Sequence, residues 1–136
     1  MGVYILLFHS FLSQAERRKY GGSDFVELQC CKLQRGTEIK KIISIDHIDI
    51  WKSDSLYLSG DDINDFLFLY SDIFNEGIYN NEKSGSLDLF GINYYPPESE
   101  EVIIKRLIER NSEDDRILTD WLTSADEHNG FYILGV

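Results

Sequence analysis

The sequence predicts an α+β (mixed α/β) fold in which a central, mainly antiparallel sheet is packed by about three to four helices. Segments of strand character occur early, in the middle and at the end of the chain, and segments of helical periodicity lie between them. The length of 136 residues suits one domain, and no internal repeat or linker divides it. We therefore expect residues 1–136 to form a single domain.

An apolar run and a basic segment begin the chain. Residues 3–12 are mostly apolar, but this run is far shorter than the roughly 20 residues that a membrane span needs. It also lacks a basic leading region and a small-residue cleavage site. We therefore expect it in the core of a cytoplasmic protein without a membrane segment. Residues 13–22, SQAERRKYGG, have basic side chains before two glycines, which is typical of a helix end.

Two further segments have strand character. In residues 24–33, DFVELQCCKL, apolar and polar side chains alternate, which predicts a half-buried strand. Cys30 and Cys31 are adjacent in it, and neighbouring side chains of a strand point to opposite faces, so we expect one buried and one exposed thiol rather than a disulfide. Unpaired thiols suit a reducing compartment. Residues 38–51, EIKKIISIDHIDIW, are rich in β-branched side chains and predict another strand.

The clearest helix is predicted for residues 61–77, DDINDFLFLYSDIFNEG, with Gly77 at its end. Apolar side chains recur at three- and four-residue spacing and form one stripe: Ile63, Phe66, Leu67, Tyr70, Ile73 and Phe74. A second stripe combines carboxylates with one leucine: Asp62, Asp65, Leu69, Asp72 and Glu76. This acidic row is either a contact surface or an ordinary solvated helix face.

Residues 86–95, SLDLFGINYY, predict a strand that includes Leu89, Phe90 and Ile92. Two prolines end it, because proline lacks the N–H that a sheet requires, and they lead into a helix. The carboxylates of its first turn lie where the helix dipole favours negative charge. Its core face is expected to carry four aliphatic side chains: Ile103, Ile104, Leu107 and Ile108.

The last elements begin at well-defined signals. Asn111 and Ser112 interrupt the helical pattern, and Ser112 with Asp115 resembles a capping box for a second amphipathic helix. The dipeptide Asn129-Gly130 predicts a turn into a final strand, FYILGV.

The formal charge of -11 is unevenly distributed. Residues 1–41 carry seven basic and four acidic side chains, a net charge of +3, so the other 95 residues carry -14. Residues 53–82 contain seven acidic side chains and no lysine or arginine. Such a surface repels phosphates and attracts basic partners, so we do not expect direct nucleic-acid binding. Acidity that serves solubility alone would give the same composition.

The sequence contains no catalytic signature. GxSxG, P-loop, HExxH, EF-hand and paired CxxC motifs are absent, and the three histidines are scattered. We therefore expect no enzyme activity and no catalytic, cofactor-binding or metal-binding residues. A less favoured alternative is a small hydrolase that uses His47 and Asp49, whose side chains would point to the same side of a strand.

Four C-terminal segments carry a family resemblance: SLDLFGINYYPPE, IIKRLIER, DDRILTDWL and HNGFYILGV. Over roughly residues 56–136 the chain resembles small bacterial immunity proteins of contact-dependent growth inhibition and related polymorphic toxin systems. The resemblance implies a toxin inhibitor that binds the C-terminal domain of its cognate toxin inside the cell. This family includes many unrelated folds, so the resemblance implies no particular fold.

The implied partner is a toxin domain, expected to be a nuclease. Such a domain would be basic, because a nuclease cleft must be cationic to hold phosphates. Acidic side chains would steer such a partner, and aromatic side chains would anchor it. Two groups of residues are candidate toxin contacts: Asp62, Asp65, Leu69, Asp72 and Glu76, and Tyr94, Tyr95, Glu98, Glu100 and Glu101. A generic acidic adaptor or regulatory protein is the alternative from the same surface.

Overall fold

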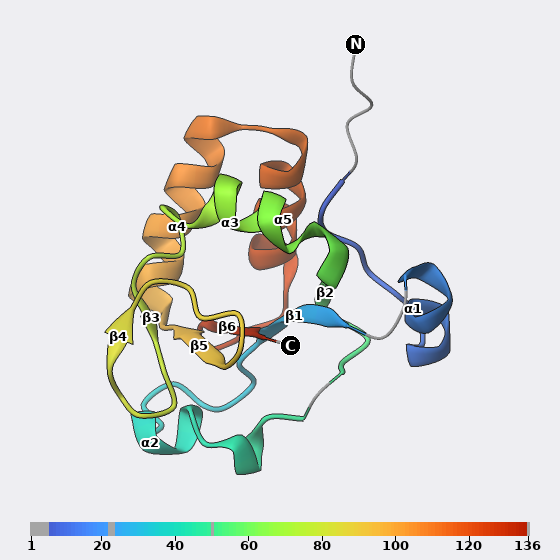
Figure 1. The fold of residues 1–136 in the computed structure, drawn as a ribbon. Helices are drawn as coiled ribbons and strands as arrows, with labels where there is room; N and C mark the ends of the chain where they lie inside the picture. The colour runs from blue at the N-terminus through green and yellow to red at the C-terminus, as the bar shows by residue number, and fades with distance from the viewer. Residues whose placement is uncertain (1–5, 22–23, 50, 136) are drawn as a thin grey trace.

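The computed structural model describes residues 6–21, 24–49 and 51–135. Within them the α-helices are α1 (Gln14–Gly21), α2 (Ile39–Ile42), α3 (Ile63–Tyr70), α4 (Pro97–Arg110) and α5 (Glu113–Ser124) (Figure 1). The strands are β1 (Phe25–Cys30), β2 (Leu56–Ser59), β3 (Gly77–Ile78), β4 (Ser84–Gly85), β5 (Ile92–Tyr95) and β6 (Phe131–Leu134). Two short 3-10 helices complete the set: η1 (Ile45–His47) and η2 (Gly60–Asp62).

The strands form one sheet in the order β2-β1-β6-β5-β3-β4, and every pairing between neighbours is antiparallel. The C-terminal strand β6 lies in the middle, where Ile133 pairs with Leu28 of β1 and Tyr132 pairs with Tyr94 of β5. Chain segments that are distant in sequence therefore meet at the centre of the sheet. The predicted α+β class with an antiparallel sheet is confirmed.

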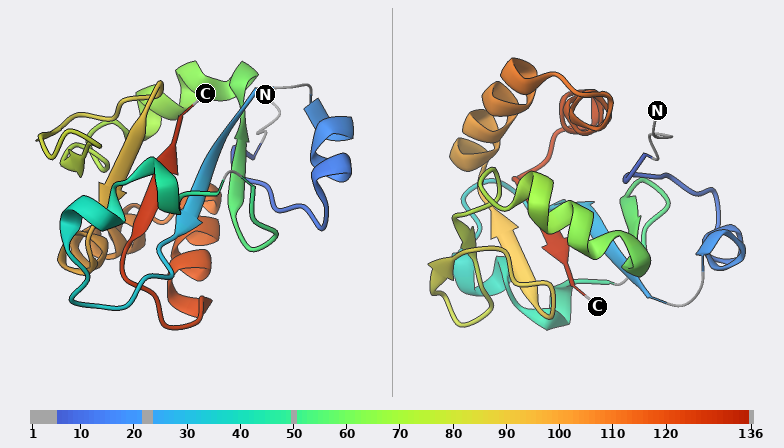
Figure 2. Two further views of the ribbon diagram at one scale, coloured as in Figure 1. Left: turned by 90° about the horizontal axis from the view of Figure 1, so that it is seen from below. Right: turned by 45° about the horizontal axis from the view of Figure 1, so that its top comes forward.

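Helices α3, α4 and α5 cover one face of the sheet (Figure 2). Their buried side chains meet those of β1, β2, β5 and β6 in one apolar core, to which Leu7 and Phe8 also contribute. The N-terminal segment is fixed to this core by an antiparallel bridge between His9 and Tyr57, and the Leu7 N–H donates to Asp114 Oδ1 at 3.0 Å. Residues 3–5 of the predicted apolar run lie outside the described residues.

The opposite face is covered by the chain around α2 and η1, where a second cluster contains Cys31, Ile42, Ile43, Tyr94 and Tyr132. The predicted strand over residues 38–51 is therefore wrong: one helical turn places adjacent Ile42 and Ile43 in this cluster together, which the alternation of a strand does not allow.

The cover on the second face also buries the polar side of β1. Glu27 and Gln29 are buried, so β1 is not the half-buried strand that its alternation predicts. Both free thiols are buried as well, which corrects the expectation of one exposed cysteine. Burial raises the pKa of the Cys30 thiol to about 12, with nearby Lys32 opposing the shift.

Helix α3 is shorter than predicted. It ends at Tyr70, and the chain continues through turns that keep Ile73 and Phe74 in the core. Gly77 belongs to β3 rather than to a helix cap, and a Cβ there would lie 3.0 Å from the Tyr95 hydroxyl. At the other end, the Ser59 hydroxyl accepts from the Asp61 N–H and begins η2, which leads into α3 at Ile63.

Strand β5 also starts later than predicted. Leu89 and Phe90 lie in a turn, in which Asp88 Oδ1 accepts from the Phe90 N–H at 3.0 Å. The Asn93 side chain bonds both the N–H and the carbonyl of Asp88, which fixes this turn against the sheet. Phe90 therefore leaves the strand alternation and becomes 84% exposed.

The C-terminal helices follow the sequence signals closely. Asn111 adopts a left-handed conformation with φ of 54° and ends α4, and the predicted capping box of Ser112 and Asp115 begins α5. Ile103 and Leu107 are buried and Ile104 packs on the core, but the predicted core residue Ile108 is exposed. The turn into β6 needs Gly130, whose φ is 75° and where a Cβ would lie 2.1 Å from the Tyr95 carbonyl oxygen.

Candidate functional site

Helix α3 presents a large aromatic side chain to solvent. Phe68 is 88% exposed and Leu69 beside it is 37% exposed, whereas Phe66 and Tyr70 on the opposite side of the helix are buried. An isolated exposed apolar side chain is ordinary on a protein surface. Here, however, the two neighbours form an apolar centre within residues 53–82, which contain seven acidic side chains and no lysine or arginine. We define the α3 face as Phe68 and Leu69 with Asp61, Asp65 and Asp72.

The carboxylates of the α3 face are exposed on both sides of its apolar centre. Asp61 and Asp65 come before Phe68, and Asp72 follows it. Asp62 is half-buried at the junction of η2 and α3, where burial, followed by the charges of Asp65 and Asp61, raises its pKa against the opposing effect of His9. The sequence predicts one helical stripe that contains Asp62, Asp65, Asp72 and Glu76. This prediction is wrong for Asp72 and Glu76, because α3 ends at Tyr70.

Two arginines of α4 hold the end of α3 in place. Arg106 Nη1 donates to the Asp72 carbonyl at 3.2 Å, and Arg110 Nη1 donates to the Leu69 carbonyl. These bonds satisfy backbone oxygens that the end of the helix leaves without partners. The backbone that carries Leu69 and Asp72 is therefore anchored, while their side chains stay exposed.

A buried carboxylate fixes Arg110 in turn. Asp115 Oδ1 lies 2.7 Å from Arg110 Nη2 and accepts from the Tyr70 hydroxyl at 2.7 Å, and its second oxygen accepts from Arg110 Nε at 2.9 Å. Burial alone would raise the pKa of Asp115, but the hydrogen bonds from Arg110, Tyr70 and Ser112 outweigh it and hold the pKa well below its ordinary value. The α3 face thus rests on a connected network that joins α3, α4 and α5.

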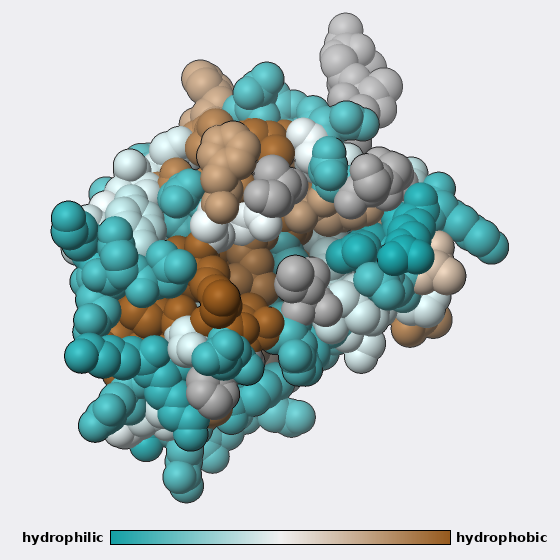
Figure 3. Space-filling view, turned by 60° about the horizontal axis from the view of Figure 1, so that its bottom comes forward, coloured by the Kyte–Doolittle hydropathy of each residue, from teal (hydrophilic) through white to brown (hydrophobic). Residues whose placement is uncertain are grey.

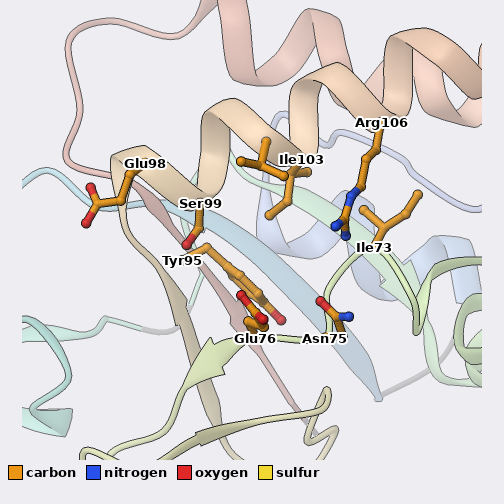
Figure 4. Close-up of a pocket in the computed structure, with 9 residues that line it drawn as sticks. Ile73, Asn75, Glu76, Tyr95, Glu98, Ser99, Ile103 and Arg106 are labelled. Atoms are coloured by element: carbon orange, nitrogen blue, oxygen red, sulfur yellow. The ribbon is translucent and has the colours of Figure 1, made fainter.

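A shallow pocket of about 140 Å³ lies beside the end of α3. Glu76 and Glu98 line it from the two sides, the Tyr95 ring lies between them, and Arg106 extends from α4 toward the loop that carries Asn75 (Figure 4). Figure 4 also shows the Glu98 side chain pointing away from Glu76. The structure therefore brings Glu76, Tyr95 and Glu98 together from the two candidate groups, although as the walls of a small recess rather than as one acidic row.

Three of the candidate contact residues are buried, although a contact surface requires exposed side chains. Tyr94 and Tyr95 are buried on opposite faces of the sheet, where their hydroxyls donate to the carbonyls of Asn129 and Phe74. Glu100 is buried too, with Oε1 at 2.6 Å from His128 Nε2. Alternation along β5 places Tyr95 in the first apolar cluster and Tyr94 in the second. All three side chains therefore contribute to the interior of the protein. Glu98 and Glu101 are exposed.

The second exposed phenylalanine belongs to a different surface. Phe90 borders a groove of about 380 Å³ that is also lined by Ile45, Ile48, Ile92 and Leu134. This groove lies on the α2 side of the sheet, where an apolar area is bordered by hydrophilic side chains (Figure 3). No charged side chain lines the groove among the described residues. Its chemistry therefore contrasts with that of the α3 face.

The structure does not support the hydrolase alternative, which requires His47 and Asp49 to lie side by side on a strand. Asp49 is exposed and lies 3.4 Å from Lys52 Nζ. The side chain of His47 lies outside the described residues, and η1 replaces the strand on which the two side chains were expected to align. Within the described ranges, no group of three or more histidine, cysteine or acidic side chains is placed to hold a metal ion.

Phe68 was absent from the sequence-based candidates. Helical periodicity places it opposite the buried stripe, so a count of apolar residues off that stripe would have found it. The hydrogen bonds from Arg106 and Arg110 reach backbone carbonyls that are 34 and 41 residues away in sequence. No sequence pattern predicts such contacts.

No protein family model, curated protein or solved structure matches this chain. In the part of the chain that the structure describes, no helix is long and apolar enough to cross a membrane.

Proposed function

We propose that this protein is an immunity protein that binds a cognate bacterial toxin domain in the cytoplasm and neutralises it through protein contacts on the α3 face. The observation that carries the proposal is the exposure of Phe68 among the carboxylates of α3. The resemblance of residues 56–136 to immunity proteins of contact-dependent growth inhibition supports the same function.

The chemistry of the α3 face suits a basic partner. Residues 53–82 carry seven carboxylates and no lysine or arginine, and Arg106 and Arg110 of α4 offset part of this charge at the end of α3. The net negative charge of the segment attracts cationic surfaces and accelerates encounter. Charge alone adds little affinity, because exposed ion pairs contribute only about 0–1 kcal/mol each. Phe68 and Leu69 supply the apolar anchor that such an interface needs at its centre.

A nuclease domain is the partner that this surface fits best, because its substrate cleft carries the positive charge that holds phosphates. The α3 face would meet that charge with Asp61, Asp65 and Asp72, while the Phe68 ring fills an apolar depression beside it. Arg106 and Arg110 fix the backbone of this face, so little backbone conformational entropy is lost when the partner binds.

The test combines the purified protein with the toxin domain encoded by the neighbouring gene. Calorimetry should give a stable complex of one to one composition, and coexpression should restore growth of cells that produce the toxin domain. No complex and no restored growth would overturn the proposal. Complex formation with a neighbour that has no toxic domain would instead favour the acidic adaptor function.

The contribution of charge is tested with neutral replacements of similar shape. Asp65→Asn with Asp72→Asn should slow association several-fold at low salt and weaken its salt dependence. Asp46→Asn is the matched control, because Asp46 is also exposed but lies in η1 on the opposite side of the sheet. Equal association rates for the two variants would show that the partner does not approach α3.

A further inference from the structure

A second feature lies at the β2 edge of the sheet, where Arg17 of α1 is enclosed by three aromatic rings. Its guanidinium carbon lies 5.0 Å from the ring centroid of Phe25, 5.2 Å from that of Tyr57 and 5.5 Å from that of Trp51. Arg17 is only 9% exposed. We call Phe25, Trp51 and Tyr57 the aromatic cage.

The cage is held by a buried carboxylate behind it. Glu27, which pairs with Tyr57 across the sheet, accepts from the N–H groups of Trp51 and Lys52 at 2.7 and 3.0 Å, and from the Ser55 hydroxyl at 2.7 Å. These bonds keep Trp51 in a left-handed conformation with φ of 79°, a strained geometry for this residue type. Trp51 stacks on Tyr57 at 5.2 Å as a result.

The occupant of the cage has three aromatic partners and one buried N–H that no polar group satisfies. The Arg17 Nε is buried without a hydrogen-bond partner, and no described carboxylate forms an ion pair with Arg17. A buried guanidinium normally has a carboxylate or carbonyl partner, because leaving its N–H groups unsatisfied is costly. The cage thus recognises the flat cationic group itself, through the ring faces.

Helix α1 has little else that attaches it to the protein. Arg17 is its only buried residue among those whose burial is described; Ala15, Glu16, Arg18 and Lys19 are exposed. A half-exposed contact is added by Tyr20, whose hydroxyl lies 2.8 Å from His9 Nε2. Figures 1 and 2 show α1 standing beside the β2 edge, away from the helices that cover the sheet. Release of Arg17 would therefore open the cage and leave α1 attached through Tyr20, whose ring also contacts those of His9 and Phe11.

We propose that the aromatic cage is a binding site for an arginine side chain of a partner protein, and that Arg17 occupies it in the free state as an internal competitor. The cage provides three aromatic rings around the guanidinium, and the carboxylate of Glu27 lies behind them. Its present occupant, Arg17, has a buried Nε without a hydrogen-bond partner. A guanidinium supplied by another chain would make the same ring contacts, and its own chain would bring a polar partner for the Nε–H, which Arg17 leaves unsatisfied. This proposal does not depend on the α3 face or on the identity of a toxin.

Because Arg17 is part of the same chain, it competes at a high effective concentration. Removing it should expose the site to a small ligand. The probe is Nα-acetyl-arginine amide, followed through the indole N–H of Trp51 by nuclear magnetic resonance. Arg17→Ala should bind this probe at least about tenfold more tightly than the wild type does. Arg18→Ala is the matched control: Arg18 is adjacent and exposed, so its removal should leave affinity at the wild-type level.

Two comparisons establish what the cage recognises. Nα-acetyl-citrulline amide has the same shape without the charge and should cause no saturable shift in Arg17→Ala. Adding Phe25→Leu to Arg17→Ala removes one ring, keeps the Trp51 reporter and should weaken arginine binding several-fold.

Arg17→Gln provides a second route to an accessible cage, since it keeps an unbranched stem and removes the charge. It should also bind the arginine probe more tightly than the wild type does. Failure of both folded variants to bind the probe would overturn the proposal and leave Arg17 as a structural anchor of α1. Equal binding by the wild type and Arg17→Ala would overturn the role of Arg17 as a competitor.

Discussion

The two faces of the sheet are built by different means. Helices α3, α4 and α5 cover one face with a continuous apolar core, and at the helix ends the buried carboxylate of Asp115 pairs with the partly exposed Arg110. The other face is covered by one helical turn, a 3-10 turn and irregular chain, beneath which Glu27 and Gln29 are buried. Regular helices satisfy their own backbone, whereas irregular chain needs side chains such as Glu27 to do so.

We expect the free energy of unfolding to fall more when a buried polar group of the helical face is removed than when one of the irregular face is removed. Asp115→Ala leaves the Tyr70 hydroxyl and part of the Arg110 guanidinium without partners inside the core. We expect the free energy of unfolding to fall by about 3 kcal/mol, measured by urea denaturation. Asp120→Ala, on the exposed side of the same helix, should change it by no more than about 0.5 kcal/mol. Equal losses would contradict the role of the network.

Glu27→Ala tests the irregular face and should cost less, about 2 kcal/mol in the free energy of unfolding. Four donors lose their acceptor: the N–H groups of Trp51 and Lys52 and the side chains of Ser55 and Gln29. The two backbone groups lie in a part-buried segment that water can reach. The fluorescence of Trp51 should shift to longer wavelength as its turn loosens. A loss larger than that of Asp115→Ala would reverse the ranking of the two faces.

The pH dependence of stability should follow Asp115 as well. Its pKa is depressed in the folded protein, so its stabilisation is present above its ordinary unfolded-state pKa and is lost as protons bind at lower pH. The wild type should therefore lose stability as the pH falls from about 5 toward about 2, more steeply than Asp115→Asn does. Parallel curves in urea denaturations across this range would contradict the assignment.

The smallest effect concerns the two thiols, of which Cys31 belongs to the apolar cluster of the second face. Both are buried, and the Cys30 pKa is raised to about 12 by burial. Native protein at pH 8 should therefore react slowly with an aromatic disulfide reagent, and both thiols should react rapidly in urea. Rapid reaction of one equivalent in the native state would instead support the alternation that the sequence predicts.

The sequence predicts the helical face better than the irregular one for physical reasons. Periodicity and local signals are sufficient for the capping box at Ser112, the turn at Gly130 and the buried stripe around Phe66, because these features depend on nearby residues. Within the β-branched segment at 38–51, residues 39–42 and 45–47 form helical turns, since packing against Tyr94 and Tyr132 outweighs local preference.

The candidate site divides in the same way. Charge along the chain predicts where acidic side chains gather, and Asp65, Asp72 and Glu76 are indeed exposed near α3. Local sequence does not predict that β5 buries Tyr94 and Tyr95, because that depends on both faces of the sheet being covered.

We propose that α3, and not exposed apolar surface in general, binds a toxin domain. Phe68 and Phe90 allow a direct comparison, since they are 88% and 84% exposed on opposite sides of the sheet. Phe68→Ala and Phe90→Ala should leave thermal stability nearly unchanged, and each is titrated into the toxin domain of the neighbouring gene by calorimetry. We predict that Phe68→Ala weakens the complex by about 2 kcal/mol, roughly thirtyfold, and that Phe90→Ala binds as the wild type does. Undiminished binding by Phe68→Ala would contradict the account.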